Sequence, residues 1–367
     1  MPTTVEGSFK TADGVDLYTK TWKPDGAPVG VIIFIHGFSD HCNTYDTLFK
    51  TLSAPPYSLQ VNAFDQRGWG RSVRQPSQRG ATGPTSAVLA DLHAFVLHTI
   101  SQLPSPPPPL FMMGASMGGA IALHYTLYTL RSTTIRNRPQ LAGLILSAPF
   151  VALDHRSAPS WVTVKAGKLA AKAFPNQQRV NKLEAKYMCR DPQVCSDWVA
   201  DPLCHDTGTL GGLSGMLQRA ADLVSLSQGA YVRSLTNELP CPIWVAHGEA
   251  DRVTSCKATQ RLYDVLSAPE GDRTMRAFPG AYHMLHKEPD GTGQDFTREV
   301  AEWCVRRCRG ERGALPPEAR KSMHVSRSRD DALRKSVDAN RVVGASTSGN
   351  GNGNGHVKKQ SNGGTKL

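Results

Sequence analysis

Continuous apolar runs of strand length recur along the chain, separated by longer segments with helical spacing. Such largely continuous apolar runs are typical of strands buried on both faces of a parallel sheet. They occupy residues 30–37, 58–65, 109–116, 141–149 and 242–248. Helical spacing is clearest over 86–103 and 122–130, each between two such runs. The alternation predicts βαβ units and an α/β fold with a doubly wound sheet.

The two ends of the chain depart from this pattern. Residues 5–11 and 15–22 alternate apolar and polar side chains around Ala12-Asp13-Gly14, which predicts an opening antiparallel hairpin. From Glu311 onward the chain is rich in Gly, Asn, Ser and Arg, with no aliphatic run longer than two residues. Such a composition does not bury enough apolar surface to offset the entropy of ordering, so we expect 311–367 to be disordered.

An insertion interrupts the sheet between Pro149 and Pro242, because this interval is too long for one crossover connection. Its first part, 161–174, places three lysines on one helical face and an apolar stripe on another. The stripe consists of Val162, Ala166, Leu169 and Ala173. We expect this lid helix either to pack on the core through the stripe or to contact lipid.

Four regions follow from these boundaries: a first part of the core at 1–150, the insertion at 151–235, a second part of the core at 236–310, and the tail at 311–367. The formal net charge of +11 is concentrated in two of them. The tail has eleven Lys and Arg against five Asp and Glu, and 151–190 has eight against two. No nucleic-acid motif accompanies these charges, which leaves an anionic membrane surface or simple solubility as their role.

The cysteines and the N-terminus bear on the cellular compartment. The N-terminus has no apolar signal segment, and no run approaches the roughly 18 apolar residues of a membrane span. The eight cysteines are irregularly spaced, which favours free thiols over a disulfide framework or a zinc site. We therefore expect a cytoplasmic protein with no metal and no cofactor.

The segment Gly-Ala-Ser-Met-Gly at 114–118 follows a predicted buried strand. A strand that enters a helix through this pattern is typical of a nucleophile elbow, in which the serine occupies a sharp turn and small neighbours avoid collision. Glycine-flanked turns are also common without catalysis. Ser116 is the candidate nucleophile, and its support comes from the rest of the chain.

A base and an acid should follow Ser116 in the order Ser, acid, His that this architecture imposes. His283 ends a strand followed by a glycine-containing loop, whereas His286 is expected to face elsewhere. Asp251 lies three residues after a buried strand, at the sheet edge where ligands bind, and Glu249 is its rival in the same loop. We prefer His283 as the base and Asp251 as the acid. The alternative role for Asp251 is to cap the helix that follows it.

An oxyanion hole needs two backbone donors. One is the amide of Met117, at the first turn of a helix, where N–H groups are unpaired and the helix dipole is positive. The other is expected from the loop after residues 30–36, from Phe38. We interpret His36 in that loop as a structural residue.

The motifs together resemble the monoacylglycerol lipase group of α/β-hydrolases, particularly its fungal members. The resemblance covers roughly 1–305 and rests on HGFSDH at 36–41, DQRGWGRS at 65–72, GASMGG at 114–119, HGEADRV at 247–253 and GAYHMLHKE at 280–288. It implies an α/β-hydrolase fold with a mostly parallel sheet, a triad of Ser116, Asp251 and His283, and amides of Phe38 and Met117 as the oxyanion hole. It also implies that 151–235 is a helical cap over an apolar acyl tunnel.

One departure concerns the head group of the substrate. Thr44 stands where animal members usually have a basic residue, while Asp40 and Tyr45 remain candidate substrate contacts. The expected activity is hydrolysis of monoacylglycerols through an acyl-enzyme. Another carboxylesterase, a lysophospholipase or a peptidase with the same triad, or a non-catalytic binding protein of this fold, remain alternatives. Transient attachment to a membrane or lipid droplet is expected from the basic segments.

Overall fold

A computed structural model describes residues 2–128, 137–158 and 160–312 of the chain. Residues 313–367, nearly all of the predicted tail, lie outside the described residues. No helix in these described ranges is both long enough and apolar enough to cross a bilayer. All eight cysteines are free thiols, as predicted.

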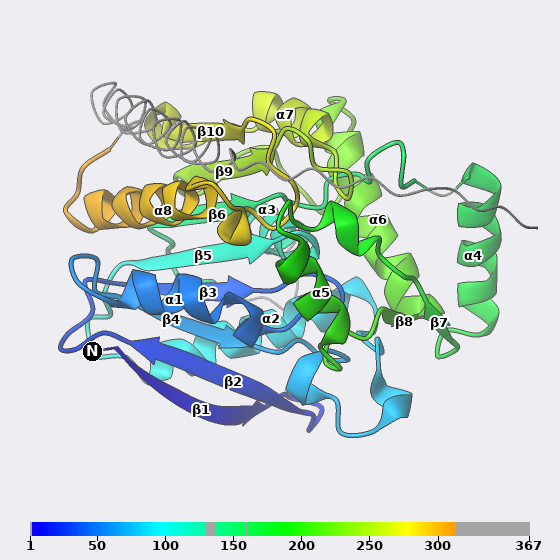
Figure 1. The fold of residues 1–367 in the computed structure, drawn as a ribbon, viewed down its shortest axis with the longest axis horizontal. Helices are drawn as coiled ribbons and strands as arrows, with labels where there is room; N and C mark the ends of the chain where they lie inside the picture. The colour runs from blue at the N-terminus through cyan, green and yellow to red at the C-terminus, as the bar shows by residue number, and fades with distance from the viewer. Residues whose placement is uncertain (1, 129–136, 159, 313–367) are drawn as a thin grey trace, which may run out of the picture. The chain divides into compact units, whose positions relative to one another are not determined.

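An eight-stranded sheet forms the centre of the fold (Figure 1). In chain order its strands are β1 (Thr3–Lys10), β2 (Asp16–Lys23), β3 (Gly30–Ile35), β4 (Leu59–Phe64), β5 (Leu110–Ala115), β6 (Gly143–Ser147), β9 (Ile243–Gly248) and β10 (Arg273–Phe278). In space they are ordered β1-β2-β4-β3-β5-β6-β9-β10. The predicted hairpin β1–β2 is antiparallel and pairs antiparallel with β4, whereas all strands from β4 to β10 run parallel.

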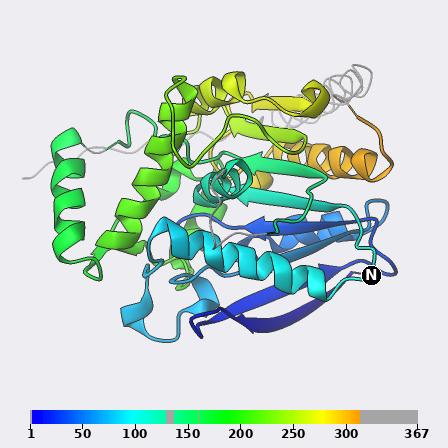
Figure 2. The same ribbon diagram turned by 180° about the vertical axis from the view of Figure 1, so that it is seen from behind.

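Helices cover both faces of the sheet (Figures 1 and 2). One face packs against α1 (Asp46–Ser53) and α8 (Thr292–Cys308), and the other against α2 (Thr85–Ser101), α3 (Met117–Leu127) and α7 (Cys256–Val265). Because helices cover both faces of the sheet, side chains on both sides of a strand are buried, which explains the continuous apolar runs in the sequence.

Strand β3 illustrates the arrangement, because all six of its residues are buried. Ile32 and Phe34 belong to the core cluster on the α1 side, whereas Val31, Ile33 and Ile35 belong to the cluster on the α3 side. Alternate residues of a strand point to opposite faces, so a strand covered on both sides is apolar throughout.

Residues 151–235, which we call the cap, separate β6 from β9. They contain α4 (Trp161–Ala173), β7 (Gln178–Val180), α5 (Pro192–Ala200), β8 (Thr207–Thr209) and α6 (Leu210–Ser227). The three helices agree with a helical insertion. The antiparallel pair β7–β8 was not predicted, because three-residue strands are too short to produce a period in the sequence. Short 3-10 helices complete the fold at Cys42–Tyr45, Gly70–Ser72, Pro76–Gln78, Ala185–Tyr187, Pro269–Gly271 and Leu285–Lys287.

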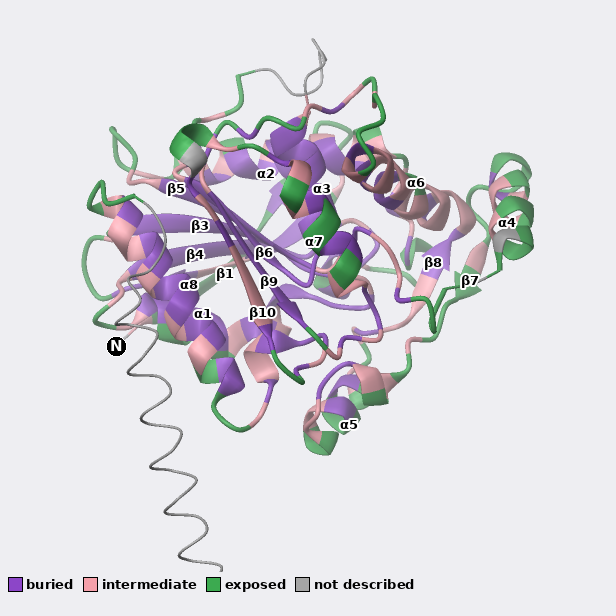
Figure 3. Ribbon diagram, turned by 90° about the horizontal axis from the view of Figure 1, so that it is seen from above, coloured by how far each residue is buried: buried purple, intermediate pink, exposed green. Residues whose placement is uncertain are grey.

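Helix α4 packs on α6, and Figure 3 shows α4 exposed over much of its length. The face toward α6 is not the apolar stripe. Ala171 is buried, and Lys168 Nζ donates a hydrogen bond of 3.4 Å to Oε1 of Gln218 on α6. In contrast, 55% of Val162 and 71% of Leu169 is exposed. The first alternative for the stripe, packing on the core, is therefore wrong.

Candidate active site

Ser116 occupies a strained turn between β5 and α3, with φ 52° and ψ −119°. This conformation is costly for a residue with a side chain and persists only where surrounding contacts enforce it. The Ser116 N–H donates to the carbonyl of Ser147 at 2.9 Å, and its carbonyl accepts from the N–H of Phe150 at 2.9 Å. The turn is thus fastened to the adjacent strand β6 and to the segment that follows it.

The flanking glycines are required by close backbone approach. A Cβ at Gly114 would lie 2.4 Å from the carbonyl oxygen of Gly118, and one at Gly118 would lie 2.1 Å from that of Ile35. Both neighbours are backbone atoms, which have no rotamer to change. The steric reason given for the Gly-x-Ser-x-Gly pattern therefore holds in this chain.

The loop after β3 lies directly against Ser116. A Cβ built on Gly37 would be 3.2 Å from the Ser116 Cβ. The ring of Phe38 packs on Trp69 with centroids 4.8 Å apart, which fixes this part of the loop. Among the described residues, the N–H groups of Phe38 and Met117 have no hydrogen-bond acceptor. Neither amide is therefore engaged by another group in this part of the chain.

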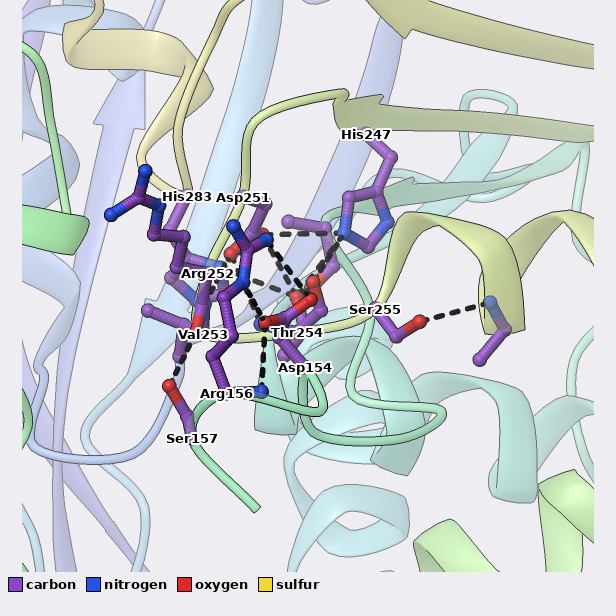
Figure 4. A network of polar contacts seen from close by, with 12 residues as sticks. Asp154, Arg156, Ser157, His247, Asp251, Arg252, Val253, Thr254, Ser255 and His283 are labelled. Atoms are coloured by element: carbon purple, nitrogen blue, oxygen red, sulfur yellow. Dashed lines mark hydrogen bonds and ion pairs between the residues drawn. The ribbon is translucent and has the colours of Figure 1, made fainter.

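Asp251 and His283 form a buried pair at the ends of β9 and β10 (Figure 4). Nδ1 of His283 lies 2.7 Å from Oδ2 of Asp251. A carboxylate is only an acceptor, so Nδ1 carries the hydrogen and Nε2 is left free to accept a proton. The sequence prediction that these two residues meet is thus reproduced in the structure.

The Asp251 carboxylate is held by further donors from its own loop. Oδ1 accepts the N–H groups of Val253 at 2.7 Å and Thr254 at 3.0 Å, and Oδ2 accepts the Thr254 hydroxyl at 2.9 Å. Burial acts to raise the pKa of Asp251, but His283, together with hydrogen bonds from His247 and His283 itself, outweighs it and lowers the pKa. The carboxyl group is ionised at neutral pH.

A second imidazole contacts the same carboxylate, and the sequence analysis missed it. His247 is fully buried at the end of β9, with Nε2 3.2 Å from Oδ2 of Asp251 (Figure 4). Nδ1 of His247 is buried and has no hydrogen-bond partner among the described residues. A signal was present: a histidine in the last positions of an apolar strand, four residues before a candidate acid, is an unusual core residue.

The two rivals occupy different environments. Glu249 is exposed and contributes nothing to the cavity at Ser116. His286, however, lines that cavity and stacks on Tyr45 with ring centroids 4.3 Å apart. The expectation that His286 faces elsewhere is wrong, because the turn at Leu285–Lys287 brings it back beside His283. Burial lowers the pKa of His286 to about 3, so this imidazole is neutral.

The cavity at Ser116 combines an apolar wall with a polar end. Its lining is Gly37, Phe38, Asp40, Tyr45, Ala115, Ser116, Ser147, Leu183, Met188, Trp198, His283, Met284 and His286. Leu183, Met188 and Trp198 belong to the cap, which therefore supplies part of the cavity wall. The cavity therefore suits a molecule with an apolar part and a polar, uncharged part.

Asp40 and Tyr45 lie together at the polar end. The Tyr45 hydroxyl donates to Oδ2 of Asp40 at 2.6 Å, and the Thr44 hydroxyl donates to Oδ1 at 2.6 Å. Burial opposes ionisation of Asp40, but the nearby His36 and the two hydroxyl donors outweigh it and lower the pKa. His36 itself accepts the Gln66 N–H at Nε2, at 2.9 Å, in agreement with its structural interpretation.

Comparison with known proteins gives a consistent result. The model of the family described as serine aminopeptidase, S33, matches residues 26–290. The monoacylglycerol lipase of Mycolicibacterium smegmatis is 30% identical, over 82% of this chain and 96% of that protein. The monoglyceride lipase of Homo sapiens is 29% identical, over 83% of this chain and 92% of that protein.

Solved structures extend this likeness to three dimensions. A soluble variant of monoglyceride lipase from Saccharomyces cerevisiae, in complex with a substrate analog, matches with a TM-score of 0.69 at 23% identity. The match covers 84% of this chain and 97% of that chain. This likeness concerns the fold, and it confirms the α/β-hydrolase fold that the sequence motifs implied.

Proposed function

The chain belongs to the family described as serine aminopeptidase, S33, and we propose that within it this protein hydrolyses monoacylglycerols through an acyl-enzyme on Ser116. Its resemblance to monoacylglycerol lipases makes it a serine ester hydrolase. The observation that carries the finer proposal is the pairing of His283 with Asp251 beside a cavity that Ser116 lines.

The reaction follows from the roles open to these residues. Ser116 Oγ attacks the ester carbonyl carbon while Nε2 of His283 takes its proton. The tetrahedral intermediate then breaks the bond to the glycerol oxygen, which receives that proton. Water attacks the acyl-enzyme with His283 as base, which releases the fatty acid and restores Ser116. Asp251 accepts the Nδ1 hydrogen and stabilises the imidazolium in both steps.

Phe38 and Met117 would supply the oxyanion hole. Their N–H groups need no rearrangement before the reaction, because neither donates to another described residue. The N-terminal end of α3 adds its positive dipole at the same point. Preorganised donors of this kind contribute about 3–4 kcal/mol each to transition-state stabilisation.

A neutral polar head group fits the polar end better than a charged amine. The oxygens of Asp40 accept from the Gly37 and His41 N–H groups as well as from the hydroxyls of Thr44 and Tyr45. A carboxylate with four donors has little capacity left for a substrate ammonium group. This disfavours an aminopeptidase and supports glycerol, whose hydroxyls could bond to Tyr45 and to the other polar atoms there.

His286 is a further candidate contact for the head group. Its Nε2 is buried without a hydrogen-bond partner among the described residues, in the wall that also holds Tyr45. A neutral imidazole nitrogen left in this way costs free energy unless a ligand satisfies it. With Thr44 in place of a basic residue, Tyr45 and His286 would bond to the glycerol, and Asp40 would contribute by accepting the Tyr45 hydroxyl hydrogen and so orienting that hydroxyl.

In this proposal residues 151–235 cover the core formed by 1–150 and 236–310, as the predicted regions suggest. Val162, Leu169 and Phe174, at and just after α4, are 55%, 71% and 66% exposed beside the lysines of that helix. An exposed apolar stripe with adjacent basic residues is typical of a helix that lies in an anionic interface. The proposal therefore includes a cytoplasmic location with peripheral attachment to a membrane or lipid droplet.

The test is hydrolysis of mono-, di- and triacylglycerols of one acyl chain by the full chain, with Ser116→Ala as the blank. Preferential release of fatty acid from the monoacylglycerol is expected. Faster turnover of a lysophospholipid or of an aminoacyl amide would show that this compound, and not a monoacylglycerol, is the preferred substrate. A folded protein that hydrolyses none of these, nor a p-nitrophenyl ester, would instead be a binding protein.

A further inference from the structure

Three side chains outside the lining of the Ser116 cavity bring together an imidazole, a carboxylate and a thiol. His41 follows the loop after β3, whereas Asp201 and Cys204 follow α5 in the cap. One ligand atom of each lies within 4.8 Å of the other two. We propose that His41, Asp201 and Cys204 bind a divalent cation of the zinc type, with water as the fourth ligand. The proposal is independent of the hydrolytic reaction, which needs no metal.

The turn after α5 places the carboxylate and the thiol side by side. Its backbone is closed by the Cys204 N–H, which donates to the carbonyl of Asp201 at 3.0 Å. The Leu203 N–H donates to Oδ1 of Asp201 at 2.8 Å, so Oδ2 is the oxygen that faces His41. Nε2 of His41 lies 2.9 Å from Oδ2. The spacing Asp-x-x-Cys thus presents two ligands on one side of a turn, opposite a third from the core.

Burial and charge favour a cation at this point. His41 is 3% exposed and Cys204 9% exposed. Two carboxylates lie close to this group: that of Asp201 is 2.9 Å from Nε2 of His41, and that of Asp40 accepts the His41 N–H at 2.8 Å. A dication in a poorly solvated region of negative charge is stabilised strongly.

The chemistry of the three groups selects the type of metal. Zinc binds imidazole nitrogen and carboxylate oxygen at about 2.0–2.2 Å and thiolate sulfur at about 2.3 Å, in tetrahedral geometry. On binding, the Cys204 thiol releases its proton to solvent. The hydrogen shared by His41 and Asp201 is lost from Nε2, and Nδ1 carries the imidazole hydrogen. Calcium and magnesium, which prefer oxygen ligands, should not compete.

An entry path and a consequence follow from the position of the ligands. The side chain of Asp201 is 30% exposed, so an ion can reach the group from solvent. The bound ion would link the cap to the segment that follows Phe38 and Asp40. It would therefore hold the cap against the loop that supplies one oxyanion amide.

The test is a titration of the reduced, metal-free full chain with Co²⁺, followed by displacement with Zn²⁺. We expect one Co²⁺ per chain, a thiolate-to-cobalt charge-transfer band in the near ultraviolet, and loss of that band when Zn²⁺ is added. Cys204→Ser should abolish the band, and Asp201→Asn should weaken Co²⁺ binding at least about tenfold. Cys195→Ser is the matched control, because Cys195 is another buried thiol of the cap.

Three results would overturn the proposal. One is a failure of Co²⁺ to bind at stoichiometric concentration. The others are a charge-transfer band that persists in Cys204→Ser and a band that disappears in Cys195→Ser. His41→Gln serves as a third variant, with circular dichroism as the check on folding. If His41→Gln fails to fold, Co²⁺ binding by Asp201→Asn decides the question, and binding as tight as in the parent would overturn the proposal. This variant should fold, because Asp201 is partly exposed and its loss removes no core packing.

Discussion

The indole of Trp198 in the cap donates a hydrogen bond of 3.1 Å to the carbonyl of Ser39, the residue directly after Phe38. Ser39 is buried and has a positive φ of 52°, a conformation that surrounding contacts must impose. Its hydroxyl also accepts the N–H of Asp206, at 2.9 Å, from the cap. The cap therefore helps to shape the loop that presents the Phe38 amide.

Trp198→Phe keeps most of the ring volume and removes this hydrogen bond. The loss of one neutral hydrogen bond is worth about 1 kcal/mol, so we expect kcat on a short soluble ester to fall about fivefold. Val199→Ala, at an exposed neighbour on α5, is the control. An unchanged kcat in Trp198→Phe would mean that the loop holds its shape without the cap.

Ser116→Ala should abolish turnover and fluorophosphonate labelling in a protein that remains folded. Removal of a nucleophile that acts with its base as a unit costs at least about a thousandfold in kcat. Labelling is read by gel fluorescence and folding by circular dichroism, with Ser101→Ala at the end of α2 as the matched serine control. A labelled Ser116→Ala protein would place the nucleophile at another residue.

His247 is expected to position Asp251 rather than to react. His247→Gln retains an N–H donor, whereas His247→Leu leaves the carboxylate without this contact. We expect kcat to fall about tenfold in the Leu variant and less in the Gln variant, with KM for a soluble ester unchanged in both. Equal losses in the two variants, or a change confined to KM, would indicate that His247 only fills space.

Stability should fall in mild acid because buried histidines are held neutral. Burial lowers the pKa of His124 on α3 to about 4, against about 6.5 in an unfolded chain. The unfolded state therefore binds the proton more readily, and stability present above about pH 6.5 is lost as the pH falls toward 4. His205 and His286 are shifted in the same direction.

His124→Gln tests this sign. Glutamine can still donate to the Arg219 carbonyl that lies 2.9 Å from Nε2 of His124, but it does not titrate. Between pH 7 and pH 5 the free energy of unfolding should drop by about 2 kcal/mol less in the variant than in the parent. Urea denaturation at the two pH values measures the difference, and parallel losses in both proteins would contradict it.

Vesicle binding should depend on the exposed stripe of α4. Leu169→Glu puts a charge where an apolar side chain would enter the interface, so binding to anionic vesicles should weaken at least about tenfold. Val199→Glu, at a residue 58% exposed on α5, controls for a general effect of charge. Hydrolysis of a soluble ester should stay unchanged in both. Equal weakening in the two variants would show that α4 has no specific part in vesicle binding.

The sheet was predictable because its strands are covered on both faces. Runs such as 30–37 and 242–248 are apolar at nearly every position for that reason, and β3 and β9 lie within them. The strand order was not predictable in the same way, since the periodicity of one segment carries no information about its neighbour. Helix α4 shows the same limit: its stripe defined two faces, but not which one packs on α6.

The candidate site was predictable where loops follow strands and less so inside the core. Asp251 and His283 stand in loops directly after strands, where a titratable residue attracts attention. His247 ends a buried strand, and His286 lies in a one-turn helix whose direction depends on residues far away in the chain. His41, Asp201 and Cys204 come together only through the packing of the cap on the loop after β3, which no local pattern encodes.

The order of the strands also has a consequence for synthesis of the protein on the ribosome. Ser116 follows β5, near the middle of the sheet, but the strands that precede Asp251 and His283 are β9 and β10, which emerge after the whole cap. A nascent chain that has formed the elbow therefore carries neither its acid nor its base. Because the contacts that complete the site are so distant in sequence, they form late in folding. The moment at which esterase activity appears in a translation reaction would thus report when β9 and β10 join the sheet.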